Sequence, residues 1–322
     1  MQPTPSMVHI DQALSNVSVA YVQSATDFIA TKVFPAVPVA SQSDEYFVYD
    51  KNDWFRDEAQ VRAPASESAG SGFNIGTADY KCTVYGIHKD VPDQVIQNAR
   101  NSPGIDPEAD AARFVAQRML LKHEKEWAQT FFTTGVWTGS STGTDITPSN
   151  LWSTYATSTP IQDVRRERTA VLGKTGIRPN TLVLGQQVYD ALLDHPDFVD
   201  RIKYTSDAAI TQEILRRLFE VDNLYVASAV QATNIEGETP AYSFVHGKNA
   251  LLVYSAPSPS LMTPSGGYTF TWDGVSDGAG LNIGTVRIEM PLKRAVRVES
   301  QMAWDSKVVA PDVGVFFSSV VA

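Results

Sequence analysis

The side chains in this sequence that could do chemistry are few and scattered. His123 and Glu126 can meet on one face of a helix. A zinc site needs a third or fourth ligand, and the surrounding sequence offers none. A solvated helix face is therefore the favoured interpretation of this pair. No two of the five histidines have the i, i+4 spacing of a helical metal pair; they stand at positions 9, 88, 123, 195 and 246.

Other candidate motifs are incomplete. His195 stands between Asp194 and Asp197 before a proline, where such residues are ordinary helix caps. Gly70-Ser71-Gly72 with Gly76 misses the dinucleotide fingerprint by one residue. The acidic loop at 273–278 lacks the ligand spacing of a calcium loop. Cys82, the single cysteine, has no neighbouring histidine and cannot form a disulfide within the chain. We expect no catalytic, metal-binding or cofactor-binding residues and no enzymatic activity; an α/β enzyme remains the alternative from another class.

Composition narrows the class further. The chain has 322 residues, 43% of them hydrophobic, and a net charge of −10 from 36 acidic and 26 basic residues. A protein that grips phosphates usually has a basic face, so sequence-specific nucleic-acid binding is not expected. The first residues lack the basic and apolar regions of a signal peptide. The longest apolar run, 250–254, is too short to span a membrane. We expect a soluble chain that is made inside a cell.

A long helix is the central element that the sequence predicts. Asp106 is a good N-cap and Pro107 a good first helical residue. No glycine or proline follows until Gly135, so residues 106–133 predict one helix of about 27 residues, or ~40 Å. The residues expected to form the core-facing side of this helix are Phe114, Leu121, Trp127 and Phe131.

The stretch 45–90 predicts a long β-hairpin without a core of its own. Residues 45–50 (EYFVYD) and 80–85 have the composition and alternation of strands, and a polar, small-residue-rich insert separates them. Because isolated hairpins are marginal in water, we expect an extended arm that lies on a neighbouring subunit. The alternative is a staple onto the parent domain. Aromatic and arginine residues favour interfaces, and charged residues would pair across subunits; the contact candidates on the arm are Tyr46, Tyr49, Trp54, Phe55, Arg56, Asp57, Glu58 and Arg62.

The N-terminal region predicts a second arm. Apolar residues repeat at roughly helical spacing between 11 and 33. One short amphipathic helix needs other residues to cover its apolar side, and these lie on the same chain or on a neighbour. Phe28 and Phe34 are the candidates for contact with a neighbour.

The remainder predicts an α+β fold. Helices at 160–172, 186–193 and 207–219 alternate with strands at 180–185 and 223–228, as in a small α/β unit. We expect this unit to close with strands at 250–256 and 268–272. From 285 the sequence alternates again as strands do. These late strands are expected to return to the long helix, which would make that domain discontinuous in sequence.

Four stretches in this order resemble one branch of the major capsid proteins of tailed bacteriophages, which have the Hong Kong phage ninety-seven capsid fold that encapsulin shells share. They are AYVQSATDFIATKVFPAVPV, YFVYDKNDWFRDEAQVRAP, HKDVPDQ and MAWDSKVVAPDVGVFF. The resemblance implies five regions: an N-arm (1–44), an E-loop (45–90), a peripheral domain with a spine helix (91–158), an axial domain (159–285) and a C-terminal return to the peripheral domain (286–322).

The resemblance also implies a function. Such proteins self-assemble as pentamers and hexamers into an icosahedral shell around a double-stranded DNA genome, within the virion. Some members cross-link an E-loop lysine to an asparagine. Lys51 and Lys81 do not match that motif, so non-covalent joining is expected. The sequence starts at the arm, so any scaffolding is expected to be a separate protein, as would be portal or decoration proteins. The alternative is an encapsulin-like container, although the sequence shows no groove for a cargo peptide.

Overall fold

We describe the fold from a computed structural model. It describes residues 23–100, 106–202, 211–235, 237–260, 263–275 and 284–322. A helix was expected between residues 11 and 33, and its first part, with the first half of the N-arm, lies outside the described residues. Residues 23–33 form only a 3₁₀ turn at Ala25–Asp27 and the short helix α1 (Ala30–Val33), so a continuous helix over this part is wrong. Among the residues inside these ranges, no helix is long and apolar enough to cross a membrane.

The long helix is confirmed as α4 (Pro107–Phe131). The Asp106 carboxylate caps it by accepting hydrogen bonds from the backbone N–H groups of Glu108 and Ala109, both at 3.1 Å. These bonds satisfy two donors that a helix start leaves unpaired. Pro107 occupies the first turn, where its missing N–H costs nothing.

The buried stripe of α4 differs in part from the expected one. Trp127 and Phe131 are fully buried, as predicted. The prediction that Phe114 faces the core is wrong, because its side chain is 41% exposed, and Leu121 is only half-buried. The helix turns a stripe with a four-residue step towards the protein interior, and Phe114 stands one position, about 100°, away from it. The apolar members of the stripe are Ala111, Val115, Met119, Trp127 and Phe131.

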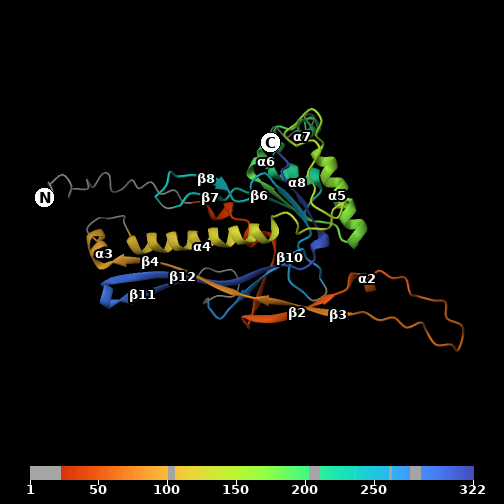
Figure 1. The fold of residues 1–322 in the computed structure, drawn as a ribbon, viewed down its shortest axis with the longest axis horizontal. Helices are drawn as coiled ribbons and strands as arrows, with labels where there is room; N and C mark the ends of the chain where they lie inside the picture. The colour runs from red at the N-terminus through yellow and green to blue at the C-terminus, as the bar shows by residue number, and fades with distance from the viewer. Residues whose placement is uncertain (1–22, 101–105, 203–210, 236, 261–262, 276–283) are drawn as a thin grey trace.

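The long helix packs along a five-stranded sheet (Figure 1). At the centre is β12 (Ala295–Val308), a strand of 14 residues. Its first half lies between β11 (Gly284–Met290) and β4 (Thr83–Pro92), and its last residues pair with β10 (Gly267–Trp272). β10 also pairs in parallel with β1 (Ala36–Val39). The late strands therefore return to the long helix, as predicted. Side chains from both layers interleave; they include Ala111 with Val298, and Met119 with Met302 and Trp304.

The α/β unit rises at the C-terminal end of α4 (Figure 1). Its sheet has the order β13–β9–β5–β6, and its strands are β5 (Thr181–Gly185), β6 (Asn223–Ala227), β9 (Ala250–Val253) and β13 (Gly314–Phe317). Its helices are α5 (Pro160–Thr175), α6 (Gln186–Leu193), α7 (Pro196–Ile202) and α8 (Gln212–Phe219).

Two strands are exchanged relative to the expected α/β unit. The stretch at 268–272 was expected to close this unit, but β10 lies in the other sheet. The closing strand is β13 instead, although residues 286–322 were expected to belong wholly to the peripheral domain. All four β13 residues are buried. The strand is covered on both faces, and such a strand is apolar throughout. Composition indicates such burial but does not choose between two sheets.

Smaller elements complete the chain. The arm is a hairpin of β2 (Ser43–Tyr49) and β3 (Ile75–Lys81). The second strand was expected at 80–85, but the hairpin uses earlier residues, and the chain enters β4 directly after the buried Cys82. The remaining elements are α1 (Ala30–Val33), α2 (Lys51–Trp54), α3 (Asp93–Ala99), β7 (Val230–Ala232) and β8 (Tyr242–Phe244).

Candidate assembly surfaces

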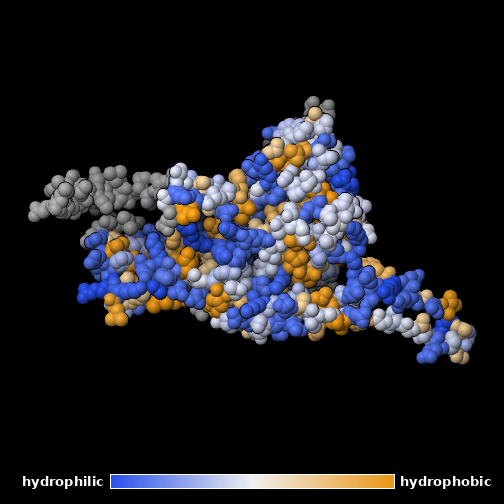
Figure 2. Space-filling view, viewed as in Figure 1, coloured by the Kyte–Doolittle hydropathy of each residue, from blue (hydrophilic) through white to orange (hydrophobic). Residues whose placement is uncertain are grey.

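The arm extends well beyond the body of the molecule (Figure 1). β2 and β3 pair in antiparallel register, with Tyr46 opposite Ala78 and Tyr49 opposite Ile75. Past this last pair the chain leaves the ladder and forms a long loop. The space-filling view shows apolar groups exposed on the arm among hydrophilic ones (Figure 2). This element therefore offers surface that its own chain does not cover.

Local hydrogen bonds shape the start of the loop. The Asp50 carboxylate caps α2 by accepting from the Asn52 backbone N–H at 2.9 Å. Asp53 accepts from the backbone N–H of Asn74 at 2.9 Å and so ties the two sides of the loop together. Above them Phe73 packs with Tyr49 and Trp54, at ring-centroid distances of 6.1 and 5.7 Å. Tyr49 is half-buried by this packing, and Trp54 remains 55% exposed.

Two residues attach the base of the loop to the body. Lys51 forms an ion pair with Asp312. The ring of Phe55 lies against Gly176, where an added Cβ would come within 3.1 Å of the ring. Gly176 ends α5 with a φ of +69°, a conformation that glycine adopts readily. For Lys51 and Phe55, the structure therefore shows contacts with their own chain, as a staple would make.

The charged residues of the tip have no such attachment to the body. Arg56 lies 4.0 Å from Glu58, and Arg62 donates to the backbone oxygen of Ser66 at 2.6 Å. Asp57 is exposed, as are the other three charged residues. Ion pairs this exposed contribute little to the fold. Their side chains are free to pair with a second chain, and that use remains a prediction.

The three remaining contact candidates face their own chain. Tyr46 is half-buried against Phe270, at a ring-centroid distance of 5.4 Å. Burial, with Asp79 nearby, raises its pKa. Phe28 and Phe34 are 2% and 1% exposed, so their assignment to contact with a neighbour is wrong. Both are buried in their own chain's core, where Phe34 packs with the aromatic residues of α4, because the N-terminal segment folds back onto the spine helix.

A buried carboxylate that sequence reasoning missed holds this segment down. Glu124, on α4, accepts from the backbone N–H groups of Ile29 and Ala30 at 3.0 and 2.8 Å. Its other oxygen lies 3.4 Å from Nε2 of His246. Burial raises the pKa of Glu124 to about 7, against the lowering effect of the backbone donors. Burial also lowers the pKa of His246 to about 3. The sequence signal for this buried carboxylate is its position: it lies directly beside the buried stripe of α4 that contains Trp127.

The same segment is attached to the α/β unit. The Gln23 side chain donates to the Val230 carbonyl at 2.7 Å and accepts from the Val230 N–H at 2.9 Å. It therefore satisfies the backbone of β7 as a neighbouring strand would. Asp27 accepts a hydrogen bond from the Ser228 hydroxyl at 3.2 Å. The segment thus connects the spine helix to the α/β unit.

The one serine–histidine pair among these described contacts is not arranged for nucleophilic attack. Nε2 of His195 lies 2.8 Å from the Ser158 hydroxyl. The Asp197 backbone N–H donates to Nδ1 at 3.1 Å, so the proton of the neutral ring is on Nε2. The ring therefore donates to Ser158, whose hydroxyl donates to Thr154, and it cannot accept the serine proton as a base would. Burial also raises the pKa of Cys82 to about 11, which disfavours a reactive thiolate.

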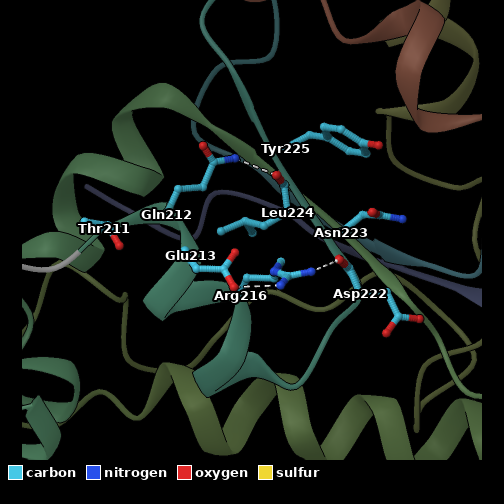
Figure 3. Close-up of a pocket in the computed structure, with 8 residues that line it drawn as sticks. All are labelled: Thr211, Gln212, Glu213, Arg216, Asp222, Asn223, Leu224 and Tyr225. Atoms are coloured by element: carbon cyan, nitrogen blue, oxygen red, sulfur yellow. Dashed lines mark hydrogen bonds and ion pairs between the residues drawn. The ribbon is translucent and has the colours of Figure 1, made fainter.

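A surface pocket between α8 and β6 also lacks catalytic character (Figure 3). Its Arg216 donates to the Asp222 carbonyl at 2.6 Å and to Glu213 at 2.7 Å. Gln212 donates to the Leu224 carbonyl at 2.6 Å. Most of these polar groups are engaged within the pocket, although Nε of Arg216 is buried without a hydrogen-bond partner. In the described part of the chain, no three histidine, cysteine or acidic side chains cluster as a metal site requires.

In sequence, this chain is similar to phage capsid proteins. Residues 141–264 match the family described as phage major capsid protein E. The major capsid protein of Burkholderia phage BcepMu is 23% identical over 267 residues, covering 81% of this chain and 82% of that protein. The major capsid protein of Pseudomonas phage JBD67 is 26% identical over 316 residues, covering 97% of both chains. By sequence, the chain is therefore similar to phage major capsid proteins over nearly its whole length.

Solved structures, phage capsids among them, share the fold of this chain. A phage-related protein from Bordetella bronchiseptica has a TM-score of 0.69 at 24% identity, covering 92% of this chain and 93% of that one. The mature capsid of bacteriophage PhiM1 follows with a TM-score of 0.60 at 12% identity, covering 94% and 89%. An encapsulin from Synechococcus elongatus also shares the fold, with a TM-score of 0.52 at 12% identity and coverage of 100% and 98%.

Proposed function

We propose that copies of this chain assemble as pentamers and hexamers into a closed icosahedral shell around double-stranded DNA. The observation that carries the proposal is the arm, which extends beyond the body (Figure 1) and whose loop exposes charged and aromatic side chains. An extended element without a core is stable in one conformation when another surface covers it. A neighbouring subunit supplies that surface in a ring.

The regions of the chain take separate roles in this proposal. The arm, 45–81, reaches the neighbouring subunit through Trp54, Arg56, Asp57, Glu58 and Arg62. The α/β unit, residues 159–256 with β13, is the axial domain around which the rings close. The spine helix and the five-stranded sheet form the peripheral domain. The described N-terminal segment, 23–34, serves within its own subunit.

The joints between subunits are non-covalent in this proposal, and the chain performs no catalysis. Lys51 is engaged by Asp312 in its own chain, which supports a structural role for this lysine. The net charge of −10 favours a container that does not bind its genome tightly. Scaffolding, portal and decoration proteins are separate partners, and the shell assembles in the host cytoplasm.

An encapsulin-like container is the second candidate, because the Synechococcus encapsulin shares the fold over its whole length. Electron microscopy and native mass measurement of the purified protein, expressed alone, test both candidates. Shells or five- and six-fold rings that are empty or contain DNA are the expected result. Shells that instead retain a host enzyme as cargo would favour the second candidate. Monomers that stay monomeric at high concentration and with crowding agents would contradict self-assembly.

A further inference from the structure

The free edge of strand β11 is the surface on which this inference rests. Among the described residues, β11 pairs with β12 along one side and with no strand along the other. Val286 and Ile288 are 49% and 42% exposed. A long exposed edge strand is a template for pairing with another strand. A proline on such an edge would block pairing, and residues 285–290 contain none.

The side chains of β11 divide cleanly between its two faces. Arg287 lies opposite Val298 of β12, on the face towards α4, and donates to Glu108 of that helix at 2.8 Å. Glu289 shares this face, because side chains alternate along a strand. The opposite face carries Val286, Ile288 and Met290. One face of the edge is therefore apolar, and the other bears one positive and one negative charge.

We propose that β11 pairs antiparallel with β11 of a second copy, about a two-fold axis at Ile288. In this register Val286 faces the partner's Met290, and Ile288 faces its own equivalent. On the other face Arg287 stands opposite the partner's Glu289, and the symmetry repeats this pair. Opposite charges and apolar pairs directly across two strands are each favourable. The proposal rests on the proposed function, since it adds a two-fold contact between subunits of a shell.

Charge excludes the neighbouring registers. Two-fold symmetry requires one residue to face its own equivalent, since such an interface is isologous. A register centred on 287 would place two arginines opposite each other, and one centred on 289 would do the same with two glutamates. Like charges in that position are destabilising. A register centred on 286 forms no charge pair and places Gly284 opposite the partner's Ile288. The register at Ile288 alone satisfies both faces.

Variants with one added cysteine test the register in assembled protein. Oxidation of the Ile288→Cys variant should link most chains into dimers, because only this position faces itself. The matched control is Val286→Cys on the same face. Its two copies would stand roughly 13 Å apart in this register, too far for a disulfide. A mixture of Val286→Cys and Met290→Cys chains should yield the mixed dimer. The wild type, whose Cys82 is fully buried, should stay unlinked.

Charge exchange tests the same contact without a crosslink. Arg287→Glu and Glu289→Arg should each reduce the yield of particles, and the double exchange should restore it because the pairs are only reversed. Glu108→Gln, which removes the partner of Arg287 on α4 but keeps its ion pair with Glu289 of the same strand, should leave the yield unchanged. Self-linking of Val286→Cys, or particles that form normally while Ile288→Cys stays unlinked, would overturn the pairing and leave the proposed function standing. Failure of the wild type to assemble would instead contradict the proposed function. If Ile288→Cys also stayed unlinked in concentrated solution, the proposed pairing of β11 would be refuted as well.

Discussion

Replacing Glu124 by glutamine should change how the stability of the subunit depends on pH. The pKa of Glu124 rises from 4.5 to about 7 in the folded chain. The folded state therefore binds this proton more tightly than the unfolded state does. The stability that proton binding contributes is complete below about pH 4.5 and is lost as the pH rises through about 7. A shift of this size corresponds to roughly 3 kcal/mol.

The wild type should accordingly lose roughly 3 kcal/mol relative to the Glu124→Gln variant between pH 4.5 and pH 8. Urea unfolding of unassembled subunits at several pH values measures this difference. His246 does not confound the comparison above pH 5, since burial lowers its pKa to about 3 and it stays neutral in the folded state of both proteins. Its unfolded-state titration is also common to both.

A second measurement locates the effect. Glu124 accepts from the amides of Ile29 and Ala30, so hydrogen exchange at these two amides should accelerate in a Glu124→Ala variant, which leaves both donors buried and unpaired. Each unpaired donor costs about 1–3 kcal/mol. Glu126→Gln is the matched control, because Glu126 lies on the same helix but pairs with Lys122 near the surface. A stability difference between wild type and Glu124→Gln that is independent of pH would refute this account of the buried carboxylate.

Three further predictions concern the arm and the core. Replacing residues 58–72 by a short glycine–serine linker should leave the melting temperature of the subunit nearly unchanged but abolish particles in electron microscopy; normal particles would contradict the role of the arm. Phe131→Ala should lower the free energy of unfolding of the subunit in urea by about 3–5 kcal/mol, because its ring is fully buried. Phe114→Ala, on the exposed side of the same helix, should lower it much less. Equal losses would mean that the buried stripe is misplaced. Gly185→Ala should lower the melting temperature by several degrees, because the new Cβ would lie 2.2 Å from the Gly247 carbonyl oxygen; an unchanged melting temperature would show that the two backbones can separate without cost.

Local signals predicted the elements of this fold well. The cap and proline at 106–107 predicted the start of α4, and the run without glycine or proline predicted its length. Short apolar stretches predicted β5, β6 and β9 of the α/β unit, and alternation predicted β11. These signals act over a few residues, and the physics that produces them is local.

Partners across long sequence separations were harder to predict. The apolar stretch at 268–272 satisfies the pattern of either sheet, and its place beside β1 and β12 depends on backbone pairing that composition does not encode. Phe28 and Phe34 fit a helix that needs cover, but the pattern does not say whose residues supply it. Glu124 was missed for a related reason: a carboxylate in a buried position looks unfavourable until its backbone donors, about 95 residues earlier, are known.

The central place of β12 has a consequence for how the chain folds during synthesis. β4 ends at Pro92, yet its partner strand begins at Ala295. At bacterial rates of translation, β4 leaves the ribosome roughly 10–40 s before β12 does. β9 likewise pairs with β13, which is synthesised much later. Neither sheet can be completed on the nascent chain until the residues after 295 have emerged, so subunits become competent to associate only after these late strands are made. Association between incomplete chains that are being translated from the same messenger RNA is therefore disfavoured.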